Sequence, residues 1–309
     1  MSITSVMYHY VRPISPSLPN LRYLPLDHFS KQLDWLCKAK RPLGREEIEG
    51  VILGERKVTD GFILTFDDGL IDHYEFVLPE LLRRELTAIF FIPTGPYIFN
   101  KLLNVHRVHI LLGKFEASEI VNQLHFFQKE LDICLMQTQQ YNRYTTHNDN
   151  ETTKYFKRLI NYELDSSLSD LLLEKLFSYF DVKMNLNDYY LSLPQIKTML
   201  SEGMMIGSHS INHRPMNSLT LEDQESEISH SFSWLESNFG SIYPRTFCYP
   251  YGGFDTFSLG TEKLLTQYQV SCSFSVEPRG ITQMDINSRP HALPRFDCNE
   301  LPFGKSNTN

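Results

Sequence analysis

Short apolar runs alternate with amphipathic helical patterns along most of this chain, and that alternation constrains the fold more than any other feature. Strand-like runs occupy residues 3–9 (ITSVMYH), 61–66 (GFILTF), 86–95 (LTAIFFIPTG) and 246–253 (TFCYPYGG). They are rich in β-branched and aromatic residues and end in polar residues or at Gly and Pro, which is typical of buried parallel strands.

The stretches between these runs carry apolar residues at spacings of three and four, which predicts helices. These helical patterns lie at 26–38, 73–86, 194–203 and 221–240. Strands that alternate with helices predict an α/β architecture built on a central parallel sheet or barrel.

One interval, at about 97–190, interrupts the alternation. It holds helical patterns at 105–115 and 167–180, a polar loop at 141–155, and almost no strand signal. We therefore predict a single domain over 1–309 with a mostly helical insertion at about 97–190.

Composition excludes several classes of protein. The chain has 309 residues, 41% of them hydrophobic, and its 37 acidic residues outnumber 29 basic ones, so a nucleic-acid partner is not expected. Five cysteines without a CxxC pair favour reduced thiols in a cytosol. The start of the sequence lacks a leader-like pattern, and no run approaches the ~20 apolar residues of a membrane span. These features predict a cytoplasmic protein, and they leave homo-oligomerisation open.

Two adjacent carboxylates, Asp67 and Asp68, come directly after the strand at 61–66. Residues just beyond the carboxyl ends of parallel strands line the site of an α/β fold, so this placement favours a functional role. The alternative is that one aspartate caps the following helix while the other is solvated.

Two histidines, His209 and His213, follow the short apolar stretch MMI. In a helical turn a spacing of four residues puts both imidazoles on one side, close enough to share a metal ion. An isolated HxxxH can also be a surface accident, but together with an aspartate it makes a ligand set that leaves positions open for water and substrate.

A third stretch, RTFCYPYGGF, runs from an apolar strand into Pro250, Tyr251 and two glycines. Glycines let a backbone approach a ligand closely, although a plain tight turn would have the same composition.

These stretches together resemble a known family. TFDDG, HSINH and FCYPYGG, in that order, resemble the first three motifs of the polysaccharide deacetylases, the NodB-homology group of carbohydrate esterases. MYHYV, TAIFFIPTG and LPRFD support the resemblance, which covers roughly residues 1–96 and 190–303. It implies a distorted (β/α) barrel of about seven strands.

The resemblance also implies roles for individual residues. Asp68, His209 and His213 would bind one divalent metal ion, with zinc expected, and Asp67 would be the catalytic base. The backbone N–H of Tyr251 would stabilise an oxyanion. Pro250, Tyr251 and His9, which lies just beyond the first strand, are predicted to contact substrate.

The sequence departs from the family pattern at two places. Cys248 stands where many relatives carry an arginine that orients the catalytic aspartate, so we predict that Arg295 in LPRFD replaces it; a surface ion pair is the alternative. The usual general acid has no clear copy, and His291 is the candidate nearest in sequence, with a turn histidine as its alternative. His9 is another candidate, whereas His73 fits an exposed position at the start of a helix equally well.

The function that these features predict is removal of N-acetyl groups from an acetamido sugar, a precursor in surface-polysaccharide biosynthesis. A cytoplasmic substrate would be nucleotide-linked, lipid-linked or a short glycan. Two alternatives are a carbon–nitrogen hydrolase of the same superfold acting on a non-sugar amide, and a catalytically silent carbohydrate-binding module.

Overall fold

Seven strands form one parallel sheet, in the order β8, β7, β6, β5, β4, β1, β9. The computed structural model describes residues 1–14, 16, 18–133 and 149–305, so residues 141–148 of the predicted polar loop lie outside the description. The strands are β1 Ile3–Tyr8, β4 Gly61–Phe66, β5 Ala88–Ile92, β6 Met205–Ser208, β7 Thr246–Cys248, β8 Cys272–Phe274 and β9 Phe296–Asp297. Two short strands, β2 Val11–Arg12 and β3 Leu24–Pro25, pair separately.

The segment that precedes β9 links the two edges of this sheet. Leu293 N donates to Ser273 O at 2.8 Å, and Ser275 N donates to Leu293 O at 2.9 Å, so the segment pairs with β8. A few residues later β9 pairs with β1, where Met7 lies opposite Asp297. The sheet therefore curls into a distorted (β/α) barrel of seven strands, and the predicted fold class is confirmed.

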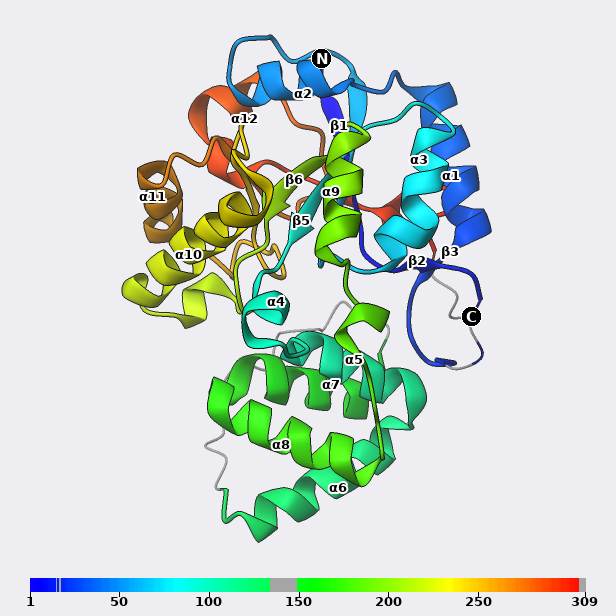
Figure 1. Ribbon diagram of the computed structural model, residues 1–309, viewed down its shortest axis with the longest axis vertical. Coiled ribbons are helices and arrows are strands. Elements are labelled where there is room, and N and C mark those ends of the chain that lie inside the picture. Colours follow the sequence, from blue (N-terminus) through cyan, green and yellow to red (C-terminus); the bar gives the residue numbers. More distant parts are fainter. Residues whose placement is uncertain (15, 17, 134–148, 306–309) are drawn as a thin grey trace. The chain divides into compact units, whose positions relative to one another are not determined.

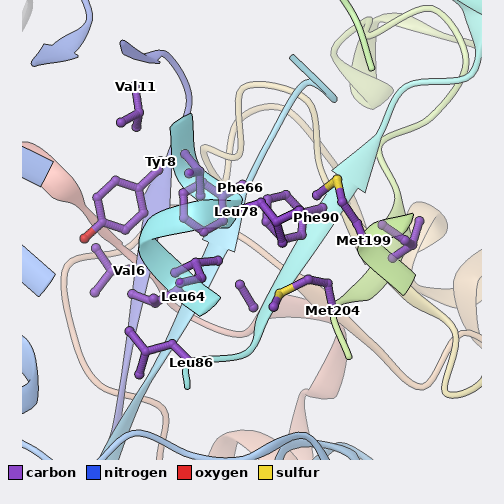
Figure 2. Packing of buried hydrophobic residues seen from close by; sticks show 14 of the residues in the cluster. Val6, Tyr8, Val11, Leu64, Phe66, Leu78, Leu86, Phe90, Met199 and Met204 are labelled. Carbon is purple, nitrogen blue, oxygen red and sulfur yellow. The ribbon is translucent and has the colours of Figure 1, made fainter. Parts of the chain in front are cut away.

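Both faces of the central strands are buried, which explains why their sequences read as continuous apolar runs. Leu64, Phe66 and Phe90 pack on one face, and the Phe66 and Phe90 rings stack with centroids 4.8 Å apart (Figure 2). Alternate residues such as Ile63 and Phe91 belong to a second cluster on the other face. Helices pack against the first face, among them α1 Leu26–Ala39, α3 Leu78–Leu82 and α9 Leu193–Ser201 (Figure 1).

The remaining helices around the barrel mostly follow strands in the chain. They are α2 Arg45–Ile52, α4 Gly95–Phe99, α10 Leu221–Phe239, α11 Leu259–Gln267 and α12 Gln283–Ser288, with short 3₁₀ helices at Leu186–Asp188, Met216–Ser218, Pro290–Ala292 and Cys298–Glu300. The helix predicted at 73–86 begins instead with a π-helical turn, His73–Val77, in which Leu78 N donates to His73 O. Pro79 has no N–H to continue the usual α-helical ladder at this point.

Residues Leu102–Asn185 form a second compact unit together with Ser15–Arg22, a segment that the sequence did not indicate as part of the helical insertion. The helices of this unit are α5 Asn104–Lys114, α6 Ala117–Glu130, α7 Glu151–Arg158, the π-helical turn Leu159–Glu163 and α8 Ser166–Tyr179. They enclose a core of their own that includes Leu111, Leu124, Phe156 and Leu173. Among the described residues of the chain, no helix is both long enough and apolar enough to cross a membrane.

Candidate active site

The two aspartates lie where β4 ends, and the backbone turns sharply there. Asp67 N donates to Tyr8 O at 2.9 Å, which extends the pairing with β1 by one residue. Asp68 and Gly69 then take left-handed conformations, with φ of 80° and 60°. A non-glycine residue in that region costs on the order of 1–3 kcal/mol and is often found at functional sites. Both carboxylates are buried, at 2% and 3% exposure.

Asp67 is held by a guanidinium from the other end of the chain. Arg295 Nη1 donates to Asp67 Oδ1 at 2.8 Å, and Nη2 donates to Oδ2 at 2.9 Å. The arginine is fully buried, with its guanidinium carbon 5.9 Å from the ring centroids of Phe91 and Phe274. Burial alone would raise the pKa of Asp67, but Arg295 outweighs that effect and lowers the pKa to about 2. The predicted contact between Arg295 and Asp67 is therefore present, and Asp67 is ionised at neutral pH.

Cys248 completes the surroundings of Asp67, in a way that the sequence did not reveal. Its thiol donates to Asp67 Oδ2 at 3.4 Å and accepts from Arg295 Nη2 at 2.9 Å. Burial raises the pKa of this thiol well above its usual range, so the group stays protonated and can act as a donor. Cys248 thus fills part of the space beside Asp67, while the positive charge comes from Arg295, which lies just before β9.

Asp68 faces both predicted histidines. Its Oδ1 lies 3.6 Å from His209 Nε2 and 3.3 Å from His213 Nε2, and one ligand atom from each of the three residues fits within a 4.8 Å cluster. His209 Nδ1 donates to Cys248 O at 2.8 Å, because a carbonyl can only accept. Burial and His213 together lower the pKa of His209 to about 4, so its imidazole is neutral at neutral pH.

The turn that carries the two histidines is not helical, contrary to the sequence prediction. Residues 209–213 have no helical assignment, and Ser210 and His213 have φ of 62° and 53°. Hydrogen bonds to the turn hold this conformation, including Thr94 N to Ser210 O at 3.1 Å and Gly95 N to Ile211 O at 2.9 Å. The imidazoles still come together, with ring centroids 4.7 Å apart.

The other predicted residues divide into two groups. His9 Nε2 lies 3.9 Å from Asp67 Oδ2, and the side chain is 39% exposed. Tyr251 has a φ of 64°, and its ring packs on His213 with centroids 5.1 Å apart; Pro250 beside it is buried. His291, by contrast, is engaged elsewhere, since its Nδ1 lies 3.2 Å from Ser273 Oγ and its Nε2 lies 3.0 Å from Thr266 Oγ1.

Two further buried side chains lie near these residues, and the burial of neither was predicted from the sequence. His73 is fully buried rather than exposed, and its Nε2 donates to His9 O at 3.1 Å. Glu227 on α10 accepts from the backbone of the histidine turn. Helical periodicity places Glu227 on the buried side of its helix, but periodicity does not show which loop a buried carboxylate meets.

Sequence comparison bears directly on the histidine turn. The family model described as polysaccharide deacetylase matches residues 177–270, the stretch that contains His209, His213 and Tyr251. Over this stretch the chain is similar to the polysaccharide deacetylases. The predicted resemblance to the NodB-homology family is thereby confirmed, and it agrees with the folds of the solved structures described next. No curated protein matches the chain significantly.

Solved structures share the deacetylase-like fold. The Streptococcus pyogenes deacetylase PplD, solved with acetate, is 16% identical with a TM-score of 0.57, over 96% of this chain and 92% of that one. IcaB from Ammonifex degensii is 16% identical with a TM-score of 0.56, over 96% and 91%. The BpsB deacetylase domain from Bordetella bronchiseptica is 12% identical with a TM-score of 0.54, over 95% of both chains. At these identities the similarity establishes the fold.

Proposed function

We propose that this protein is a metal-dependent hydrolase that removes N-acetyl groups from an acetamido sugar. The observation that carries the proposal is the pairing of two buried carboxylates with different neighbours: Asp67 with a guanidinium, and Asp68 with two imidazoles. The family match over the histidine turn supports the reaction class. The overall reaction consumes one amide and one water and gives acetate and an amine.

Within the part of the chain that the structure describes, two groups of side chains could hold the ion, and they share His209. One is Asp68, His209 and His213; the other is Asp67, His209 and Cys248. The second group is the poorer site because Arg295 Nη2 lies 2.9 Å from both Asp67 Oδ2 and Cys248 Sγ, and a guanidinium at that distance repels a divalent cation. We therefore assign the ion to the first group.

The donor set of this group fits a divalent ion, with zinc the expected one. One carboxylate and two imidazoles are usual ligands of catalytic zinc sites with open positions. The hydrogen bond from His209 Nδ1 to Cys248 O fixes the tautomer that turns Nε2 toward Asp68. A bound ion would acidify a water molecule and polarise the carbonyl of the acetamido group.

The remaining steps belong to residues of the chain. Asp67, kept ionised and oriented by Arg295, accepts the proton of the attacking water. The backbone N–H of Tyr251, held by the left-handed turn, stabilises the oxyanion that forms on the substrate. His9 is assigned the proton donation to the departing amine, because it lies beside Asp67 and reaches solvent, whereas both ring nitrogens of His291 are engaged with other side chains.

The substrate assay separates this proposal from its alternatives. Purified protein loaded with zinc is offered a nucleotide-linked N-acetylhexosamine, a lipid-linked one, a short acetylated oligosaccharide, a long acetylated polymer and a set of non-sugar N-acetyl amides. Acetate and amine are both measured. We expect release from the sugar precursors, in keeping with a biosynthetic role; the precursor role and the cytoplasmic location stay predictions.

Release from the non-sugar amides alone would favour the carbon–nitrogen hydrolase. Tight binding of oligosaccharide with full metal occupancy and no acetate would favour the silent binding module. Efficient release from the long polymer alone would contradict the precursor role while leaving the deacetylase chemistry intact.

A further inference from the structure

The turn between His209 and His213 is clamped from two sides. On one side, the loop after β5 donates to its carbonyls, through Thr94 N to Ser210 O and Gly95 N to Ile211 O. A side chain at Gly95 would place a Cβ 2.4 Å from Ile211 O, so only glycine permits this approach. The carbonyl side of the turn is therefore fixed by backbone alone.

On the other side, one carboxylate accepts the N–H groups of the same turn. Glu227 Oε2 accepts from Ile211 N at 2.7 Å and from Asn212 N at 2.9 Å, and Oε1 accepts from Asn212 Nδ2 at 2.6 Å. Glu227 is 6% exposed. A buried carboxylate is costly unless its oxygens are satisfied, and here three N–H donors satisfy it.

The same face of α10 also holds the start of the turn. Ser231, one helical turn beyond Glu227, contacts Ser208 with the two hydroxyl oxygens 2.6 Å apart. Ser208 Oγ in turn accepts from Ser210 N at 3.2 Å. Residues four apart on a helix lie on one side, so α10 presents a polar strip to the histidine turn.

We infer that Glu227 is a positioning residue that sets the metal affinity of the site. The inference rests on the metal site of the proposed function. Ile211 and Asn212 lie between His209 and His213 in the turn. Because the Glu227 carboxylate orients the N–H groups of these two residues, it also fixes the directions in which the two imidazoles point. The left-handed φ angles of Ser210 and His213 persist only because the surroundings over-determine them.

Three substitutions separate position from charge. Glu227→Ala removes the carboxylate that accepts hydrogen bonds from two backbone N–H groups of the turn. Glu227→Asp keeps the charge but shortens the side chain by one methylene, which withdraws the acceptor from the turn. Glu227→Gln keeps the length, and its amide oxygen can still accept from Ile211 N and Asn212 N while the Asn212 side-chain amide turns over to accept from the new NH₂ group.

A residue on the same helix gives the matched control. Gln224 is 3% exposed, accepts from Thr261 Oγ1 at 2.7 Å and donates to Leu219 O at 3.1 Å. Gln224→Ala therefore removes a buried polar side chain with two hydrogen bonds from α10 without touching the histidine turn.

The readouts are zinc affinity, by competition with a chromophoric chelator, and the visible spectrum of the Co²⁺-loaded protein, which reports ligand geometry. For folded protein we expect Glu227→Ala and Glu227→Asp to weaken zinc binding about 10- to 100-fold and to shift the Co²⁺ spectrum, the scale seen when an outer-shell partner is lost. Glu227→Gln should stay within about threefold of the parent, because the hydrogen-bond pattern survives. Gln224→Ala should change neither readout.

Parent-like affinity and spectrum in Glu227→Asp would overturn the inference, and this variant decides the matter if Glu227→Ala does not fold. A loss in Gln224→Ala equal to that in the Glu227 variants would also overturn it, since the effect would then be general to the helix. If the parent protein itself binds neither ion, the metal site of the proposed function fails, and the inference fails with it.

Discussion

Asp67 and Asp68 are neighbours in the chain and almost equally buried, yet their side chains meet different chemical groups. Asp67 receives two hydrogen bonds from Arg295 and one from the Cys248 thiol. Asp68 instead faces the Nε2 atoms of His209 and His213. One carboxylate is therefore matched by a charge from the protein, whereas the other faces two imidazole nitrogens, an arrangement that suits a metal ion.

The largest effect is expected on the Asp68 side. His209→Ala or His213→Ala removes one of the three ligands, so the divalent ion should be lost and hydrolysis abolished while the fold persists. Elemental analysis of metal content, circular dichroism and acetate release check the three parts. His230→Ala, at an exposed position of α10, is the control and should match the parent. Full metal occupancy in either histidine variant would remove that histidine from the ligand set.

On the Asp67 side, Asp67→Asn should separate chemistry from metal binding. The amide keeps the shape of the side chain but cannot accept the proton of water, so turnover should fall by roughly two orders of magnitude or more with metal content unchanged. Acetate release and elemental analysis are measured on the same preparation. Turnover near that of the parent, with the ion bound, would show that another group takes the proton.

The guanidinium is tested next, because it makes Asp67 different from Asp68. Arg295→Met leaves a buried carboxylate without its cation and should lower the free energy of unfolding by about 3–5 kcal/mol. Adding Asp67→Asn to Arg295→Met removes that charge, so the double variant should recover part of the loss. Denaturant unfolding of the single and double variants measures this coupling, and simple additivity of the two changes would contradict the ion pair.

Replacement of the same arginine by lysine is a milder change. An ammonium keeps the charge but cannot donate two parallel hydrogen bonds to Asp67, so Arg295→Lys should fold and should lower turnover. Turnover and metal content are measured on the same preparation. Lower turnover with unchanged metal content would identify the orientation of Asp67 as the cause. Parent-like turnover would restrict Arg295 to a structural role.

The smallest effect is expected at Cys248. Cys248→Ala removes the thiol donor to Asp67 and should cost about 1 kcal/mol of stability together with a few-fold loss of turnover, the scale of one hydrogen bond. Cys248→Ser keeps a donor and should lose less. Cys272→Ala on the neighbouring strand removes a buried thiol of the same size and serves as the control. Equal losses of turnover at both cysteines would reduce Cys248 to a packing role.

Local sequence signals predicted strands β1, β4, β5 and β7, about half of the helices, and the residues at the strand ends, because burial and periodicity are encoded in short stretches. The shortest strands and helices, such as β8 and α12, have too few residues to show a period. The position of Arg295 beside Asp67 was predictable only through the family resemblance, because Cys248 stands where the family pattern has an arginine. The contact between the Cys248 thiol and Asp67 was not predictable, because the curled sheet brings together two residues that are 181 positions apart. The hydrogen bonds from Glu227 were not predictable either, because they depend on how α10 packs against the histidine turn. The joining of Ser15–Arg22 to the helical unit is likewise a long-range packing result.

The measurement that tests the division of roles most directly is the metal content of Asp67→Asn and Asp68→Asn, purified side by side and equilibrated with zinc. Each amide replaces a carboxylate of the same size, so the two variants are matched in side-chain volume at adjacent positions. We predict about one ion per chain in Asp67→Asn and strong depletion in Asp68→Asn. The reverse result would place the ion in the group formed by Asp67, His209 and Cys248 and would contradict the assignment of Asp67 as the base.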